Sequence, residues 1–175
     1  NWPNDNKGFM KDLNNSEDDV YITPMLELTT PVDFKIVAVH GEKCLEVNNA
    51  SIEENATINQ KTFSGGDNQK WRVISIGLGY YKIIAKHSEK CLTVKNDSNN
   101  TIFVVQCNYT GADSQFWSLE VIESGKYYLV SKQYKKYLTV KNASIENGAG
   151  INLDNRTAMS YQQWFIQPIG NTVPP

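Results

Sequence analysis

Three copies of one segment dominate the sequence and restrict the folds that it can adopt. Each copy has an apolar run ending in Leu-x-Val, then an isoleucine and a closing Gln-x-Trp motif, and the closing tryptophans lie 46 and 47 residues apart. The runs are Asp33–Val47, Tyr80–Val94 and Lys126–Val140, the isoleucines are Ile58, Ile102 and Ile151, and the motifs are Gln69–Trp71, Gln115–Trp117 and Gln162–Trp164. A repeat of this length indicates one supersecondary unit that buries its apolar face against its neighbours.

Each copy divides into four short runs with the composition of β-strands. Val, Ile, Thr, Tyr and Trp alternate with polar residues, and Gly, Asn, Asp and Ser separate the runs. In the first copy we expect strands over Phe34–His40, Lys43–Val47, Thr57–Phe63 and Lys70–Ile76. Three such units are too few to close a propeller. The sequence therefore predicts an all-β fold, a β-trefoil of three pseudo-symmetric four-strand units, over residues 33–168.

Length and charge describe what surrounds this domain. The chain has 175 residues, 40% of them hydrophobic, which suffices for one domain with a core. A net charge of −2 and the lack of a long apolar run argue against a nucleic-acid partner and against membrane insertion. Residues 1–32 form an acidic leader or linker, and residues 169–175 form a C-terminal tail. Because the chain starts at Asn1 without a signal peptide, we expect a piece of a longer chain, whose leader packs on the trefoil or binds a protein partner.

The three Gln-x-Trp motifs, each preceded by Leu-x-Val, resemble those of the ricin B-chain-like lectin family. The resemblance implies that the motif residues are structural, with indoles that fill the core and glutamines that bind buried backbone groups. These residues are Gln69, Trp71, Gln115, Trp117, Gln162 and Trp164. The resemblance also implies a shallow pocket for galactose-type sugars in each unit. The pocket's parts are an acid just after Cys-Leu, an aromatic ring that stacks on the sugar, and an asparagine before Gln-x-Trp.

The three units keep these pocket positions to different degrees. The positions hold Glu46, Lys61 and Asn68 in the first unit, Thr93, Val105 and Ser114 in the second, and Thr139, Asp154 and Tyr161 in the third. The first unit keeps the acid and the amide, and Asn59, Gln60 and Asp67 add polar groups nearby, so it is the best candidate for binding carbohydrate. The third unit is a weaker candidate through Asp154 and Tyr161. The second is expected not to bind sugar.

Lys61 stands where the family has its stacking ring. An ammonium group cannot stack on a sugar, but it can donate to the carboxylate of an acidic sugar, which favours acidic glycans as ligands. The alternative is that Lys61 pairs with Glu46 in a surface ion pair, worth at most about 1 kcal/mol, and that the pocket no longer binds.

The resemblance also implies a disulfide between Cys91 and Cys107. The matching positions in the other units are Cys44 with Phe63, and Tyr137 with Arg156. We therefore expect Cys44 to be a buried free thiol, although all three cysteines being free is the other reading. No cluster of cysteine and histidine has the spacing of a metal site, and no cofactor is expected.

Two further features recur with the repeat. His40 and His87 occupy the same turn of successive units, which we interpret as repeat geometry rather than as catalysis or metal binding. Eight Asn-x-Ser/Thr sequons occur, at Asn14, Asn49, Asn55, Asn96, Asn99, Asn108, Asn142 and Asn155. Asn49, Asn96 and Asn142 fall at one repeat-equivalent turn, where asparagine is favoured for backbone reasons alone. The sequons agree with a glycosylated secreted protein and equally with an unglycosylated, asparagine-rich one.

Two function classes follow from these observations. The leading hypothesis is a lectin-like module that attaches a larger secreted or cell-surface protein or complex to galactose-type or acidic glycans. The alternative is a trefoil that does not bind sugar and serves as a protein-binding scaffold or accessory subunit, for example of a toxin. Motifs of hydrolases, zinc proteases and phosphate-binding loops are absent from the sequence, so we expect no enzymatic activity.

Overall fold

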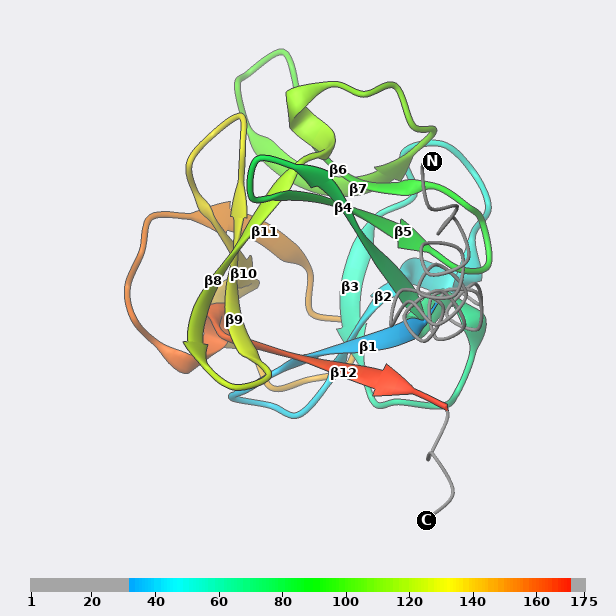
Figure 1. Cartoon of the computed structure of the whole chain (residues 1–175), viewed down its shortest axis with the longest axis vertical. Coiled ribbons are helices and arrows are strands. Elements are labelled where there is room, and N and C mark those ends of the chain that lie inside the picture. The colour runs from blue at the N-terminus through cyan, green and yellow to red at the C-terminus, as the bar shows by residue number, and fades with distance from the viewer. Residues whose placement is uncertain (1–31, 171–175) are drawn as a thin grey trace, which may run out of the picture. The chain divides into compact units, whose positions relative to one another are not determined.

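The computed structural model describes residues 32–170 and contains twelve strands and five 3-10 helices within them (Figure 1). The strands are β1 (Asp33–Ala38), β2 (Cys44–Val47), β3 (Ile58–Lys61), β4 (Trp71–Gly77), β5 (Tyr80–Ala85), β6 (Cys91–Asn96), β7 (Ile102–Cys107), β8 (Trp117–Glu123), β9 (Lys126–Ser131), β10 (Tyr137–Val140), β11 (Ile151–Asp154) and β12 (Trp164–Ile169). The helices are η1 (Asn48–Ala50), η2 (Asp67–Gln69), η3 (Asp113–Gln115), η4 (Lys141–Ala143) and η5 (Ser160–Gln162). The expected packing of the leader concerns residues that lie outside the described range.

Six of the strands close a barrel and the other six form three hairpins. Around the barrel, β1 pairs with β4 and β12, β4 with β5, β5 with β8, β8 with β9, and β9 with β12, all antiparallel. The hairpins are β2–β3, β6–β7 and β10–β11, one in each unit. Figure 1 shows the three units arranged around a central axis. The prediction of a β-trefoil with three four-strand units is confirmed.

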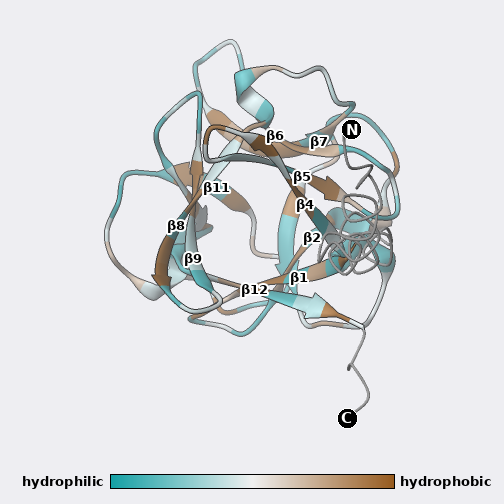
Figure 2. Cartoon of the chain, viewed as in Figure 1, coloured by the Kyte–Doolittle hydropathy of each residue, from teal (hydrophilic) through white to brown (hydrophobic). Residues whose placement is uncertain are grey.

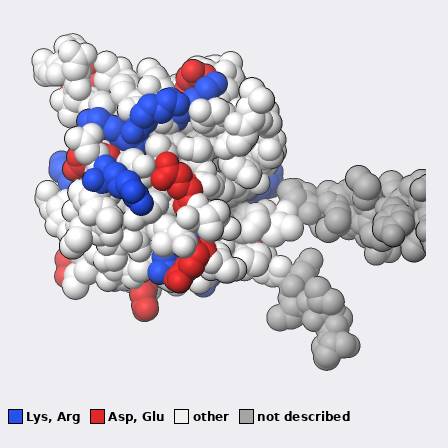
Figure 3. Space-filling view, turned by 60° about the vertical axis from the view of Figure 1, so that its left-hand side comes forward, with Lys and Arg blue, Asp and Glu red and all other residues white. Residues whose placement is uncertain are grey.

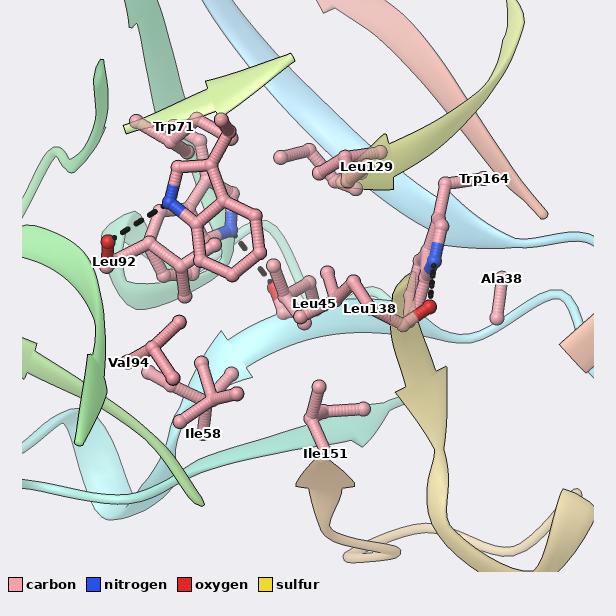
Figure 4. Packing of buried hydrophobic residues seen from close by; sticks show 14 of the residues in the cluster. Ala38, Leu45, Ile58, Trp71, Leu92, Val94, Leu129, Leu138, Ile151 and Trp164 are labelled. Carbon is pink, nitrogen blue, oxygen red and sulfur yellow. Dashed lines mark hydrogen bonds between the residues drawn. The ribbon is translucent and has the colours of Figure 1, made fainter. Parts of the chain in front are cut away.

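The three tryptophans of the Gln-x-Trp motifs meet in the barrel core. Trp71, Trp117 and Trp164 are fully buried, and their indole N–H groups donate to the carbonyls of Leu45, Leu92 and Leu138 at 2.9–3.0 Å (Figure 4). Each indole therefore ties the start of one barrel strand to the hairpin of its own unit. Figure 2 shows apolar residues along the barrel strands and polar residues in most of the connecting loops. This distribution is what burial of the inner strand faces requires.

The glutamines of the same motifs bind the loops that precede them. Their Oε1 atoms accept from the backbone N–H of the residue five positions earlier, Ser64, Thr110 or Thr157, at 2.7–2.8 Å. Their Nε2 atoms donate to the carbonyls of Thr62, Asn108 and Asn155 at 2.7–3.0 Å. Because all three side chains are buried, these bonds satisfy polar groups that water does not reach.

The second hairpin is longer than the other two, and this changes the match between units. β6 and β7 pair over six residues, whereas β2–β3 and β10–β11 pair over four. The residues opposite the valine of Leu-x-Val are Ile58, Val104 and Ile151, so Ile102 is not the counterpart of the other two isoleucines. The sequence match was therefore wrong by two residues in the second unit.

Two site assignments change with this register. The position matched to Lys61 and Asp154 is Cys107, not Val105, because each of the three lies opposite the first residue of its hairpin. Phe63 and Arg156 are consequently not the counterparts of Cys107. Asn96, expected in a turn, ends strand β6, since the extra residues extend the hairpin past the turn of the other units.

A pair of one cation and one aromatic ring recurs in the three units and supports the corrected register. Lys35 Nζ lies 5.3 Å from the ring centroid of Phe63, and Lys82 Nζ lies 4.4 Å from that of Tyr109. In the third unit the two chemistries exchange positions, and the Arg156 guanidinium lies 5.1 Å from the ring of Tyr128. The contact is thus kept although both residues differ, as expected of a favourable cation–π pair.

Two of the three unit boundaries are held by a side-chain clasp. Gln60 of β3 donates through Nε2 to the carbonyls of Ser144 and Glu146 at 2.8 and 3.0 Å, and His40 Nε2 lies 2.7 Å from the same Ser144 oxygen. Gln106 and His87 bind the loop at residues 51–53 in the same way. Both histidines thus hold loops in repeat-equivalent positions. The third hairpin has Leu153 in place of the glutamine, opposite Leu138.

Candidate functional site

The three cysteines are buried free thiols, so the disulfide implied between Cys91 and Cys107 is not formed in this structure. These two residues lie directly opposite each other on β6 and β7. Cys107 Sγ instead contacts Asn55 Oδ1, at 3.5 Å, from the loop of the first unit. Cys44 is unpaired, as expected. Burial raises the pKa of Cys44 and of Cys91 to about 11, so both thiols are protonated and poorly nucleophilic at neutral pH.

Glu46, the acid of the first-unit pocket, is held from within the protein. Its side chain lies on β2 and is only 3% exposed. Oε2 accepts from Gln69 Nε2 at 3.1 Å and from Asn68 Nδ2 at 3.4 Å, and Asn68 also donates to Val47 O at 3.0 Å. Oε1 accepts no hydrogen bond from residues 32–170. The carboxylate therefore supports the Gln-x-Trp motif and keeps one oxygen for a further donor.

Strand alternation separates the other first-unit candidates. Asn59 lies opposite Glu46 in the hairpin and shares its face with Lys61, whereas Gln60 points to the other face. Gln60 is fully buried and uses both amide hydrogens in the clasp. Its assignment to the sugar pocket is therefore wrong. Asn59 is 9% exposed and donates to Asn48 Oδ1 at 3.0 Å.

Lys61 and Asp67 are exposed at the rim of the first unit. Lys61 forms no ion pair with any residue that the structure describes, so the alternative pairing with Glu46 is not observed. Asp67 lies on η2 and pairs with Lys70 at 2.8 Å, a hydrogen bond that lowers the pKa of the Asp67 carboxyl. This ion pair leaves Asp67 the less available of the two for a ligand.

The second unit contains a hollow of about 340 Å³, although no sugar pocket was expected there. It is lined by Glu54, Thr93, Lys95, Cys107, Asn108, Thr110, Ser114 and Gln115. Thr93 replaces the acid and accepts from Gln115 Nε2 at 3.3 Å, so a neutral hydroxyl does here what Glu46 does in the first unit. A carboxylate enters from the neighbouring unit instead, since Glu54 Oε1 accepts from the Asn108 N–H at 2.6 Å.

The third unit contains a hollow of about 300 Å³ that brings both of its predicted residues together. It is lined by Thr139, Val140, Lys141, Asn142, Ala143, Asn152, Asp154 and Tyr161. Thr139 accepts from Gln162 Nε2 at 3.1 Å, which satisfies the motif without the acid. Asp154 is exposed, and one of its oxygens accepts from the Asn155 N–H at 2.7 Å. Tyr161 is half-buried, with its ring edge-to-face against His40 at 6.3 Å.

Asn152 is the clearest feature of this hollow that the sequence did not reveal. It lies opposite Thr139 on β11, and its buried Oδ1 has no hydrogen-bond partner among the described residues. Asn59 occupies the equivalent position of the first unit, and its Oδ1 is likewise buried without a partner. A buried acceptor without a donor is costly, so both amide oxygens are left unsatisfied in this structure.

Charged side chains are distributed unevenly over the trefoil. Figure 3 shows lysine and arginine side chains in a band across the face that carries β8–β11, with smaller acidic groups beside it.

Within residues 32–170 no three acidic, histidine or cysteine side chains gather as metal ligands would. The same part of the chain has no helix long and apolar enough to span a membrane.

The chain belongs to the family of ricin-type β-trefoil lectin domain-like proteins. The family model matches residues 26–106, 76–154 and 113–173, in three overlapping copies that follow the repeat. The class suggested by the Gln-x-Trp motifs is therefore confirmed. A search of curated proteins gives no match.

Solved structures agree with this assignment. The designed threefold-symmetric protein ThreeFoil is 40% identical, with a TM-score of 0.75 over 78% of this chain and 99% of that one. An exo-β-1,3-galactanase from Clostridium thermocellum is 28% identical, with the same TM-score, over 81% of this chain but only 31% of that enzyme. The Macrolepiota procera ricin B-like lectin, solved with lactose, is 14% identical at a TM-score of 0.66 over 80% of this chain and 97% of that one, and shares the fold.

Proposed function

We propose that the chain is a carbohydrate-binding module and that the hollow of the third unit is its principal sugar site. The observation that carries the proposal is the combination of groups lining that hollow. Tyr161 offers a ring for the apolar face of a sugar, Asp154 offers an exposed carboxylate for its hydroxyls, and Asn152 adds an amide to the lining. A neutral polyol requires these groups, because it presents only hydroxyls and one C–H face.

The first unit contributes a second candidate in this proposal. Glu46 keeps one carboxylate oxygen free of protein donors, with Asn59 opposite it and Asn68 beside it. Its side chain is almost fully buried, whereas Asp154 is exposed, so we rank the first unit below the third. Galactose-type sugars are the ligand class that the family suggests.

The proposed context is a secreted or cell-surface protein in which this module attaches a larger protein or complex to glycans. Ricin-type lectins are commonly extracellular, and all seven sequon asparagines in the described range are exposed. The match to one part of a galactanase supports a role as an accessory domain beside other domains. We propose no catalytic activity for residues 32–170, and any link to a toxin or to a protein partner of residues 1–32 remains a prediction.

Calorimetric titration with galactose and lactose tests this function. We expect millimolar or tighter binding by the wild type and about a five- to twelvefold loss of affinity in Tyr161→Ala, since stacking on a ring is worth on the order of 1–1.5 kcal/mol. Tyr109→Ala is the matched control, because Tyr109 is an exposed tyrosine outside the third hollow. If a glycan array and both titrations give no binding, the carbohydrate proposal is wrong and the non-binding scaffold takes its place.

A further inference from the structure

The hollows of the second and third units share a feature that the first unit lacks. The residue directly after Leu-x-Val is Lys95 in the second unit and Lys141 in the third, and each lysine lines the hollow of its own unit. The first unit has Asn48 at this position, where its amide oxygen accepts from Asn59. An ammonium group therefore borders two of the three equivalent sites.

Each of these hollows also contains a carboxylate, but the two carboxylates have different origins. Glu54 comes from the loop of the preceding unit, whereas Asp154 ends the hairpin of the third unit itself. Each hollow is thus lined by one acidic residue and one lysine, although the acid comes from a different part of the chain in each. A hydroxyl of a neutral sugar can accept from a lysine, but an anionic substituent on the ligand accepts more strongly, since charge-assisted hydrogen bonds are roughly twice as strong as neutral ones.

The lysines are not neutralised by these acids. Neither Lys95 nor Lys141 forms an ion pair with any residue between 32 and 170, and the Lys95 ammonium group donates to the neutral amide oxygen of Asn55. Residues 33–175 carry a net charge of about +2, because residues 1–32 hold six acids and two lysines of a chain whose total is −2. This net positive charge favours an anionic ligand.

From these observations we infer that the second- and third-unit hollows select glycans that carry an anionic group, a carboxylate or a sulfate, bound by Lys95 and Lys141. The inference rests on the proposed carbohydrate function and names the ligand class of those sites. Glu54 or Asp154 accepts from sugar hydroxyls, while the ammonium group donates to the anionic substituent. It differs from an acid preference set by Lys61, which is exposed at the rim of the first unit.

Paired titrations with lactose and 3′-sialyllactose test this inference. The two probes share the lactose part and differ by one carboxylated sugar. We expect the wild type to bind the sialylated probe about three- to fivefold more tightly, in line with an exposed ion pair worth up to about 1 kcal/mol. Lys95→Ala with Lys141→Ala removes this preference, so that the two probes bind the double variant with similar affinity. Raising sodium chloride from 0.05 to 0.5 M reduces the preference in the wild type, because salt screens exposed charges.

Lys61→Ala is the matched control, since it removes an exposed lysine of the first unit. Equal affinity of the wild type for the two probes, an unchanged preference in the double variant, or loss of the preference in Lys61→Ala overturns the inference while leaving carbohydrate binding intact. Failure of both probes to bind contradicts the proposed function itself. Thermal melting of each variant checks that the substituted chain is folded.

Discussion

The first and third hairpins are equivalent in the repeat, but they carry their acidic residue at different positions. In the first unit, Glu46 is buried and accepts from the motif glutamine Gln69. In the third, Thr139 accepts from Gln162 with a hydroxyl, and the carboxylate stands at Asp154, exposed at the end of β11. The first unit therefore places its acid in the internal network, and the third places its acid where a ligand can reach it.

The same two hairpins also differ in how they contact the neighbouring unit. Gln60 of the first binds the loop at residues 144–149 through both its backbone and its side chain. Leu153, its counterpart in the third, carries no polar group to bind a loop, and the facing hairpin of the second unit has longer strands joined by a shorter connection, residues 97–101. A longer hairpin and the loss of the glutamine thus occur together at one unit boundary. This boundary thus differs from the other two both in the side-chain contact and in the strand length of the facing hairpin.

Gln60→Leu, which copies the third unit, is expected to give the largest effect. The Glu146 carbonyl loses its donor and the Ser144 carbonyl keeps only His40, so the free energy of unfolding falls by about 2–3 kcal/mol. Urea denaturation followed by tryptophan fluorescence measures this loss. Leu153→Ile is the control in the unclasped hairpin, with an expected change below about 1.5 kcal/mol. Equal losses in the two variants would mean that the clasp does not distinguish the hairpins.

Glu46→Ala comes next and tests whether the acid of the first unit is structural. Gln69 and Asn68 lose a charged acceptor, and we expect a loss of about 1.5–2 kcal/mol of stability. Glu46→Thr installs the residue of the other two units, whose hydroxyl accepts from the motif glutamine, and retains most of the stability. A stable Glu46→Ala variant with lost lactose binding would instead identify the first unit as the sugar site.

Cys44 should make the stability of the protein depend on pH. The third unit has no thiol at the equivalent position, where Tyr137 stands. Burial raises the pKa of Cys44 from 9.0 to about 11. The thiol ionises at a lower pH in the unfolded chain than in the folded one. The stability that the raised pKa contributes is therefore complete below pH 9 and is lost between pH 9 and 11. At pH 10 the free energy of unfolding is lower than at neutral pH by about 1.4 kcal/mol through this thiol. Cys44→Ala should therefore lose less stability than the wild type between pH 7 and 10 in urea titrations, and parallel curves contradict this assignment.

Gly41→Ser should give a smaller gain. Gln106 Oε1 accepts from Ser88 Oγ at 2.7 Å, whereas Gln60 Oε1 is buried without a partner and the position matching Ser88 is Gly41. An added Cβ there lies no closer than 3.4 Å to Ile145. We expect about 0.5–1 kcal/mol of stabilisation from the new donor and from the lost chain entropy of glycine. Gly41→Ala, which adds the Cβ without the hydroxyl, separates the two contributions, and a destabilised serine variant would show that Ile145 does not accommodate it.

The repeat predicted the fold because each Gln-x-Trp motif marks the same core position in every unit. The second-unit register was missed because Ile102 imitates the isoleucine of the other units, while the real counterpart is Val104. Alternation along β3 does carry the signal that Gln60 points away from Glu46, since neighbouring residues of a strand face opposite sides.

The binding hollows depend on information that a single repeat does not contain. Glu54 enters the second hollow from another unit, and only the likeness between Ser51–Ala56 and Ser144–Ala149 hints that these loops have a shared role. Asn152 gains its meaning from pairing with Thr139 and from its unpartnered oxygen, both of which require the folded hairpin. Composition alone cannot supply contacts between units or the burial of one atom.

The central claim, that the third unit binds the sugar, is tested most directly by mapping the ligand on the protein. An amide NMR titration with 3′-sialyllactose should shift the side-chain amide of Asn152 and the backbone signals of Asp154 and Tyr161. The side-chain amides of Asn68 and Asn59 in the first unit should stay unchanged over the same titration. Shifts confined to Asn59 and Asn68, with the third-unit signals unmoved, would contradict the account and return the site to Glu46.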